Sequence, residues 1–229
     1  MGNLHKTKGV VLNFIKYKES SIITKIFTEE FGVKSYIVNG VRSKKSKTNK
    51  IAFFQPLTFL NLVVYNKENT DLNRIATVHI YKPYSSLCFE FRKVSISIFL
   101  AEFLGKAIKE EGANPNLYHF LNESLFAFDE LLSEYENFHI QLLLKLANHL
   151  GFAVFDAQDL NLSSSQNFLI DNSLHAAINH FIQTDYSDFL PLNGKKRWEI
   201  LQALIQFYQF HVENFGAIKS LPILREILS

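Results

Sequence analysis

The chain has 229 residues, of which 47% are hydrophobic and 20% are charged, and its formal net charge is +2. This length gives room for one or two domains with a buried core, and the composition excludes a disordered or collagen-like chain. The single cysteine, Cys88, excludes an internal disulfide framework and a zinc site built from several cysteines.

Location is constrained by the N-terminus and by the apolar runs. The first eight residues carry basic side chains without an apolar signal segment behind them. No apolar run approaches the ~18 residues that a membrane-spanning helix needs. A lone cysteine also suits the reducing cytosol. We therefore expect a cytoplasmic protein without a membrane partner.

The charges are unevenly distributed along the chain. Residues 1–80 hold 13 Lys and Arg against 5 Asp and Glu, whereas residues 81–229 hold 11 against 17. A basic first third indicates a polyanionic partner, of which nucleic acid is the usual one. An uneven but merely solubilising surface is the alternative.

The first 80 residues have the two-residue periodicity of strands. Short β-branched or aromatic runs alternate with polar or glycine-bearing breaks. Five strands are predicted, at 7–15, 20–28, 34–40, 57–65 and 72–80. Five short strands in about 80 residues fit a small closed barrel, and the OB-fold is the five-stranded form. An SH3-like barrel fits the number of strands nearly as well.

Beyond Pro83 the periodicity becomes helical. Helices are predicted from Phe91, over 114–132, over 138–150, from Trp198 to Phe215, and near Leu224. Asn114 is the expected N-cap of the second helix, with Pro115 at its first position. The pattern fails between 152 and 172, where 163–167 is a polar loop or a small insertion. The prediction is an α+β protein: a barrel domain over 1–80 and an all-α helical domain over 81–229.

The segment between the third and fourth predicted strands is strongly basic. Residues 39–50 contain five cations and no carboxylate, interleaved with small polar side chains. Such a barrel loop can follow a phosphodiester backbone while nearby aromatic rings stack on bases, and the alternative is a mobile, solvated run of charge. The predicted DNA-binding residues are Arg42, Lys44, Lys45, Lys47 and Lys50. The candidate stacking residues are Tyr17, Tyr36, Phe53 and Phe54, although a strand aromatic is more often part of a core.

Signatures of catalysis are missing from the sequence. There is no glycine-rich dinucleotide fingerprint, no phosphate-binding loop and no nucleophile elbow. The histidines are not spaced as metal ligands, and Cys88 has no basic neighbour in sequence. We therefore expect neither enzymatic activity, nor a metal, nor another cofactor. A nuclease or other enzyme, assembled from distant residues, ranks last among the hypotheses.

Several segments, in order and at matching spacing, resemble the RecO family of bacterial recombinational-repair proteins. They include the first-strand run 7–12, the strand end and glycine at 27–32, and Gln55-Pro56-Leu57 before the fourth strand. The basic segment 39–46 resembles the family's glycine-plus-basic "GARR-KS" stretch. The likeness covers about the first 80 residues by motif and the rest by organisation.

This resemblance implies an N-terminal OB-fold, a helical domain, and a non-enzymatic recombination mediator associated with the nucleoid. It implies binding of single- and double-stranded DNA and annealing of complementary strands. It also implies that the protein acts together with RecR and the single-stranded-DNA-binding protein to promote the loading of RecA. Gly32 and Gly40 are then turn residues of the barrel. Many family members carry a four-cysteine zinc element in the helical domain, which this chain with its one cysteine cannot form.

The resemblance also implies a pocket for the acidic, apolar C-terminal tail of the single-stranded-DNA-binding protein. From charge alone, Lys145, Lys195 and Arg197 are candidates for its carboxylate contacts. A competing hypothesis is an adaptor whose basic barrel binds an acidic protein in place of DNA. Competition between an oligonucleotide and an acidic peptide distinguishes the two.

Overall fold

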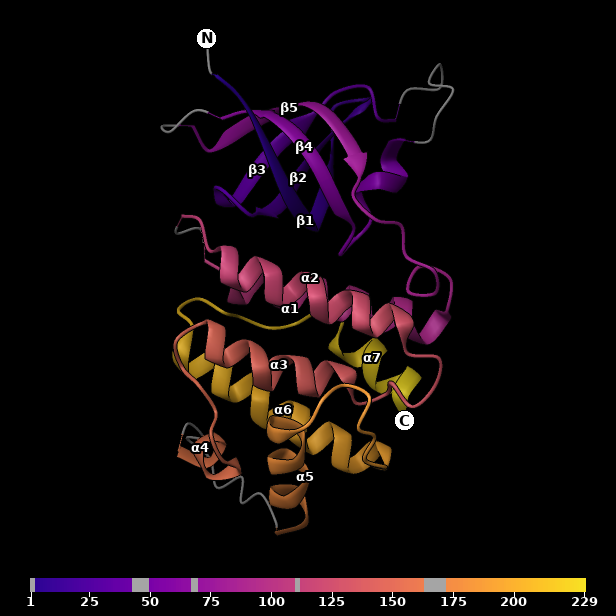
Figure 1. Cartoon of the computed structure of the whole chain (residues 1–229), viewed down its shortest axis with the longest axis vertical. Helices are drawn as coiled ribbons and strands as arrows, with labels where there is room; N and C mark the ends of the chain where they lie inside the picture. The colour runs from indigo at the N-terminus through magenta and orange to yellow at the C-terminus, as the bar shows by residue number, and fades with distance from the viewer. Residues whose placement is uncertain (1–2, 43–49, 67–69, 110–111, 163–171) are drawn as a thin grey trace. The chain divides into compact units, whose positions relative to one another are not determined.

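The computed structural model describes residues 3–42, 50–66, 70–109, 112–162 and 172–229. The chain divides into two compact units (Figure 1). The first combines Met1–Tyr84 with Ala101–Asn122, and the second combines Ser85–Leu100 with Glu123–Ser229. The first unit is therefore not one continuous stretch, because it includes a helical segment from beyond the barrel.

Within the described residues, five strands form a closed barrel in the order β1-β2-β3-β5-β4. They are β1 (Leu4–Tyr17), β2 (Ser21–Thr28), β3 (Gly32–Val38), β4 (Phe59–Tyr65) and β5 (Leu72–Ile80). A short 3-10 helix, η1 (Lys50–Phe54), precedes β4. Antiparallel ladders join all neighbours except β3 and β5, which pair in parallel. This topology is that of the OB-fold, which confirms the predicted barrel and decides against the SH3-like alternative.

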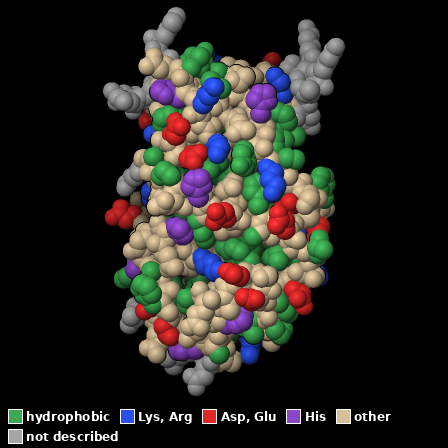
Figure 2. All heavy atoms as spheres, in the orientation of Figure 1, with side chains coloured by type: hydrophobic (Ala, Val, Ile, Leu, Met, Phe, Trp, Pro, Cys, Tyr) green, Lys and Arg blue, Asp and Glu red, His purple; other side chains and the backbone are tan. Residues whose placement is uncertain are grey.

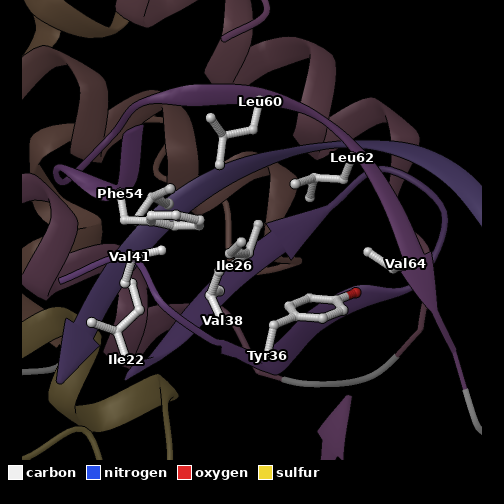
Figure 3. Packing of buried hydrophobic residues seen from close by; sticks show 10 residues of the cluster. Ile22, Ile26, Tyr36, Val38, Val41, Phe54, Leu60, Leu62 and Val64 are labelled. Atoms are coloured by element: carbon white, nitrogen blue, oxygen red, sulfur yellow. The ribbon is translucent and has the colours of Figure 1, made fainter. Parts of the chain in front are cut away.

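The barrel core is built from the inward positions of the strands. Alternate residues face inward because successive side chains of a strand point to opposite sides. Ten buried residues form the cluster, and Figure 3 shows the Tyr36 ring lying among the aliphatic side chains. The cluster contains Val11, Ile22, Ile26, Tyr36, Val38, Val41, Phe54, Leu60, Leu62 and Val64.

A helical segment closes one end of the barrel. The Tyr118 ring lies 6.2 Å from Phe27 and 5.8 Å from Phe59, measured between ring centroids, and all three side chains are buried. At the same end, a Cβ added to Gly32 would lie 2.1 Å from the carbonyl oxygen of Gly112. Gly32 has a φ of +66° and Gly40 a φ of +70°, so both are turn glycines, as expected.

Helices follow the barrel in the chain. They are α1 (Phe91–Ala107), α2 (Pro115–Glu130), α3 (Phe138–His149), α4 (Ala157–Leu162), α5 (Asn172–Gln183), α6 (Gly194–His211) and α7 (Leu221–Leu228). Asn114 caps α2 as expected, since its Oδ1 accepts a hydrogen bond from the Leu117 amide at 3.0 Å. Two helices, α4 and α5, lie where no helix was predicted. The polar loop 163–167 lies outside the described residues.

A buried charged cluster ties the linker before α1 to the end of α2. The Asp129 carboxylate accepts hydrogen bonds from the backbone amides of Ser85, Ser86 and Leu87 at 2.7–2.8 Å. The Lys93 ammonium, fully buried, donates to the Ser86 hydroxyl and to the carbonyls of Asp129 and Leu131. These bonds replace the water that both charges lose on burial.

No helix in the described part of the chain is long and apolar enough to cross a membrane.

Candidate nucleic-acid interface

Arg42 is held against the β1–β2 turn. Its backbone amide donates to the Ser20 carbonyl at 3.0 Å, and its Nη1 donates to the Lys18 carbonyl at 3.2 Å. Nearby, the Ser21 hydroxyl donates to Asn39 Oδ1 at 3.0 Å. These bonds place the start of the basic segment beside a turn more than 20 residues earlier in the chain. They therefore gather Arg42 and Lys18 at one end of the barrel.

Of the other four predicted cations, the structure describes only Lys50. Lys50 is exposed and begins η1. Lys44, Lys45 and Lys47 lie outside the described residues. Sequence reasoning missed Lys16, which is exposed near the end of β1, and Lys18, which is exposed just after β1 and whose carbonyl accepts the hydrogen bond from Arg42 Nη1. Their signal was present in the strand pattern, because a β1 extended to residue 17 ends in alternating lysines and aromatic or apolar residues.

An outward face adjoins this end of the barrel, over β1, β2 and β3. Asn13, Lys25 and Ser35 stand in register across the three strands, and so do Ile15, Ile23 and Ile37. Ile15 is 60% exposed, so this row offers apolar surface to solvent. A cation beside exposed apolar side chains is the combination that contacts phosphate and base together. We call these six residues the β1–β2–β3 face.

The four candidate stacking residues divide into two kinds. Tyr17 and Phe53 are half-buried, and the Lys18 ammonium lies 5.4 Å from the Tyr17 ring centroid. Tyr36 and Phe54 are fully buried in the barrel core (Figure 3). A ring enclosed on all sides has no face left for a base. This placement corrects the prediction for Tyr36 and Phe54, and Tyr17 and Phe53 remain.

The helical unit contains a pocket of about 340 Å³. Its apolar lining comes from Trp198, Leu201, Leu224 and Leu228, and the cations Lys195, Arg197 and Arg225 also line it. The Arg225 guanidinium lies 4.6 Å from the centroid of the Trp198 ring. Lys195 is 84% exposed at the rim, with its ammonium 3.9 Å from Glu199. Apolar walls with a cationic rim suit an anionic ligand that also carries an apolar group.

His139 borders the same pocket, and its side chain is fully buried. Burial, with a smaller contribution from the charge of Arg197, lowers its pKa to about 3. Neither ring nitrogen has a hydrogen-bond partner among the described residues. A neutral imidazole with both nitrogens unpaired is a costly buried group unless a ligand or water meets it.

The three candidate tail-contact residues have different surroundings. Lys195 and Arg197 both line the pocket, whereas Lys145 does not. Arg197 already donates to Asn137 Oδ1, the Leu192 carbonyl and the Leu228 carbonyl at 2.6–3.0 Å. Lys145 donates to the Thr184 carbonyl at 2.6 Å and lies 4.7 Å from the Tyr186 ring centroid. Of the three, Lys195 has the most accessible side chain for a partner.

In the part of the structure that is described, no three His, Cys, Asp or Glu side chains come together as metal ligands. Burial, followed by the nearby charge of Asp129, raises the pKa of the Cys88 thiol. A raised pKa keeps the thiol protonated and unreactive.

Comparisons with known proteins agree along the chain. The family description "Recombination protein O N terminal" matches residues 1–84, which include the whole barrel. The description "Recombination protein O C terminal" matches residues 88–155. The two together cover more than half of the chain.

Curated relatives match over almost the whole length. A protein of Flavobacterium psychrophilum named "DNA repair protein RecO" is 32% identical, over 98% of this chain and 99% of its own. Proteins of the same name from Bacteroides fragilis and Christiangramia forsetii are 31% and 30% identical, with at least 96% of each chain covered. Family descriptions, near full-length similarity and an OB-fold barrel agree, and the chain belongs to the RecO family.

Proposed function

We propose that this chain is a non-enzymatic recombination mediator of DNA repair. It binds single- and double-stranded DNA through the barrel and anneals complementary strands. With RecR, it promotes the loading of RecA onto strands coated by the single-stranded-DNA-binding protein, in the cytoplasm and on the nucleoid. The observation that carries the proposal is the basic end of an OB-fold barrel in a member of the RecO family.

The barrel end supports DNA binding through the character of its side chains. Lys18 and Arg42 lie together, Lys50 is exposed, and Tyr17 is half-buried beside Lys18. Lysine and arginine exchange condensed counterions for direct contacts with phosphate, while aromatic faces accept bases without sequence preference. Lys44, Lys45 and Lys47 belong to the same proposal by sequence. Annealing follows because cations lower the repulsion between two strands held close together.

Fluorescence anisotropy of labelled single-stranded and duplex oligonucleotides tests DNA binding. Charge reversal of Arg42, Lys44, Lys45 and Lys47 should weaken binding at least about 100-fold, because four phosphate contacts become repulsive. The double variant K109E/K219E changes one exposed lysine just after α1 and one in the α6–α7 loop, and should bind within about threefold of the unchanged protein. Equal affinity of the reversed and unchanged proteins would refute the assignment of the basic segment.

An adaptor that binds an acidic protein predicts a different result in competition. Under the mediator proposal, an unlabelled oligonucleotide displaces the labelled one far more effectively than an acidic peptide of equal charge does. Preferential displacement by the peptide would favour the adaptor.

The mediator also performs no chemical step, so labelled DNA incubated with Mg²⁺ and homogeneous protein should keep its length.

The helical-unit pocket supports the partner part of the proposal. The acidic residues of the tail of the single-stranded-DNA-binding protein would lie near Lys195 and Arg225, and its apolar residues against Trp198 and Leu201. Arg197, which lines the pocket and donates to the Leu228 carbonyl, adds positive charge there, whereas Lys145, which donates to the Thr184 carbonyl, is not among the lining residues.

Anisotropy of a labelled acidic tail peptide tests the pocket. The variants Lys195→Glu and Trp198→Ala should each weaken binding about tenfold, because one removes a cation and the other the apolar wall. Lys109→Glu, outside the pocket, is the matched control. Unchanged affinity in both pocket variants would show that the tail binds elsewhere.

A further inference from the structure

A second outward face of the barrel lies over β1, β4 and β5. Three rows cross these strands in register: Leu4, Tyr65 and Arg74; Lys6, Val63 and Thr77; Lys8, Asn61 and His79. Between these rows, Thr7, Leu62 and Val64 are buried, so the rows point away from the core. We call these nine residues the β1–β4–β5 face.

The face combines cations with exposed aromatic rings. Lys6, Lys8 and Arg74 supply three positive charges, and none of its nine residues is a carboxylate. Tyr65 is 41% exposed, as is Tyr81, which follows β5. The Lys8 ammonium lies 5.2 Å from the Tyr81 ring centroid. Cations interleaved with exposed rings are the means by which OB-folds hold a single strand.

The face is also hollowed. A pocket of about 380 Å³ is lined by Lys6, Lys8, Val63 and His79, among others, and also by the carboxylates Glu29 and Glu30. The Glu29 amide donates to the Lys8 carbonyl, and its carboxylate lies 3.3 Å from His119 Nε2. In Figure 2, blue and purple basic side chains stand among uncharged ones over the barrel, with a few carboxylates. The two carboxylates oppose phosphate binding beside them, so the attraction of the face for a nucleic-acid strand comes from its three cations, Lys6, Lys8 and Arg74.

The two outward faces are separate. β1 pairs with β4 through Leu4–Val10 and with β2 through Gly9–Tyr17, so each half of β1 belongs to a different face. Because the sheet closes on itself, the two faces point in different directions around the barrel (Figure 1). A strand bound at Arg42 and Lys25 therefore leaves the β1–β4–β5 face open.

We propose that the β1–β4–β5 face holds a second nucleic-acid strand. One barrel then carries two complementary strands on separate surfaces, and annealing proceeds by transfer between them. This inference rests on the proposed DNA-binding function and adds the site of the second strand.

The double variant K6E/K8E tests the inference, with two measurements on the full chain. Anisotropy gives the affinity for one labelled strand, and fluorescence quenching gives the annealing rate of two complementary strands. We expect the annealing rate to fall at least about tenfold while single-strand affinity changes less than about threefold, because the first strand uses the other face. Y65A/Y81A should reproduce this pattern without a change of charge. Both variants are compared with K109E/K219E and checked for folding by circular dichroism and thermal unfolding.

Three outcomes overturn the inference. In one, K6E/K8E and Y65A/Y81A both anneal at the rate of the unchanged protein. In another, single-strand affinity falls as far as the annealing rate, which would make the face part of the first site. In the third, the unchanged protein binds strands without annealing them. Failure of the unchanged protein to bind any strand would instead refute the proposed function itself, together with this inference.

Discussion

Gly32 sits at a point where neither its conformation nor its space tolerates a side chain. Its φ is +66°, and a Cβ would lie 2.1 Å from the Gly112 carbonyl oxygen. We expect Gly32→Ala to lower the free energy of unfolding by about 2–4 kcal/mol, from the left-handed backbone and the clash together. Gly40→Ala is the matched control, because Gly40 has a φ of +70° but nothing within 4 Å, and should cost only about 1 kcal/mol. Urea unfolding of both variants measures the difference, and equal losses would contradict the role of Gly112.

His139 makes stability depend on pH. Its pKa in the folded chain is about 3, against an unperturbed 6.5. Between these values the unfolded chain binds a proton that the folded chain excludes. Stability therefore falls as pH drops from 6.5 toward 3, by up to about 1.4 kcal/mol per pH unit. His139→Leu should reduce this slope, as measured by urea unfolding at several pH values. An unchanged slope would mean that His139 is protonated or solvated in the folded protein.

At the scale of elements, the linker before α1 is fixed by charge as much as by packing. Burial alone would raise the pKa of Asp129, but hydrogen bonds from the amides of Ser85, Leu87 and Ser86 outweigh it, so the pKa is lowered. Burial lowers the pKa of Lys93, and neighbouring carboxylates oppose that shift. The pair joins three segments: the linker, α1 and the end of α2.

Removing either charge should loosen this junction. Asp129→Asn should cost about 2–4 kcal/mol at pH 7, because buried amides lose their charged acceptor. The lowered pKa means that this contribution is present above about pH 4 and lost as pH falls through the folded value, so the two proteins should converge in acid. Glu123→Gln, exposed on the same helix, should have little effect. A constant difference down to pH 2 would contradict the assignment.

The elements that the sequence predicted are those whose periodicity comes from a single buried face. The strand 72–80 was predicted with its observed bounds, and α2 begins at Pro115 after the predicted cap. Helices α4 and α5 were not predicted. α4 has only six residues, so its apolar pattern is too short to indicate a helix. α5 has a clear apolar stripe, with Leu174, Ala177, Ile178 and Phe181 buried at the spacing of one helix face.

At the scale of the whole molecule, the uneven charge distribution predicts a moderate dependence of DNA binding on salt. If about four or five cations of the barrel contact phosphates, the log–log slope for single strands should be near −3. A rise from 50 to 200 mM salt should then lower affinity roughly 100-fold. Anisotropy titrations across this range measure the slope. A slope near zero would contradict electrostatic binding, whereas one steeper than about −6 would require cations well beyond the basic segment.

The sequence by itself determined those features of the protein that depend only on local residue pattern and on composition. The alternating strands, the helical period after Pro83, the single cysteine and the basic segment needed no tertiary information. The tertiary structure decided which side chains meet. Tyr36 and Phe54 are buried, and Arg42 donates a hydrogen bond to the Lys18 carbonyl. Lys145 donates to the Thr184 carbonyl, and the ring nitrogens of His139 have no hydrogen-bond partner in the pocket that Trp198 also lines. Periodicity assigns a residue to a face of its own element, but only the register and packing between distant elements decide what covers that face.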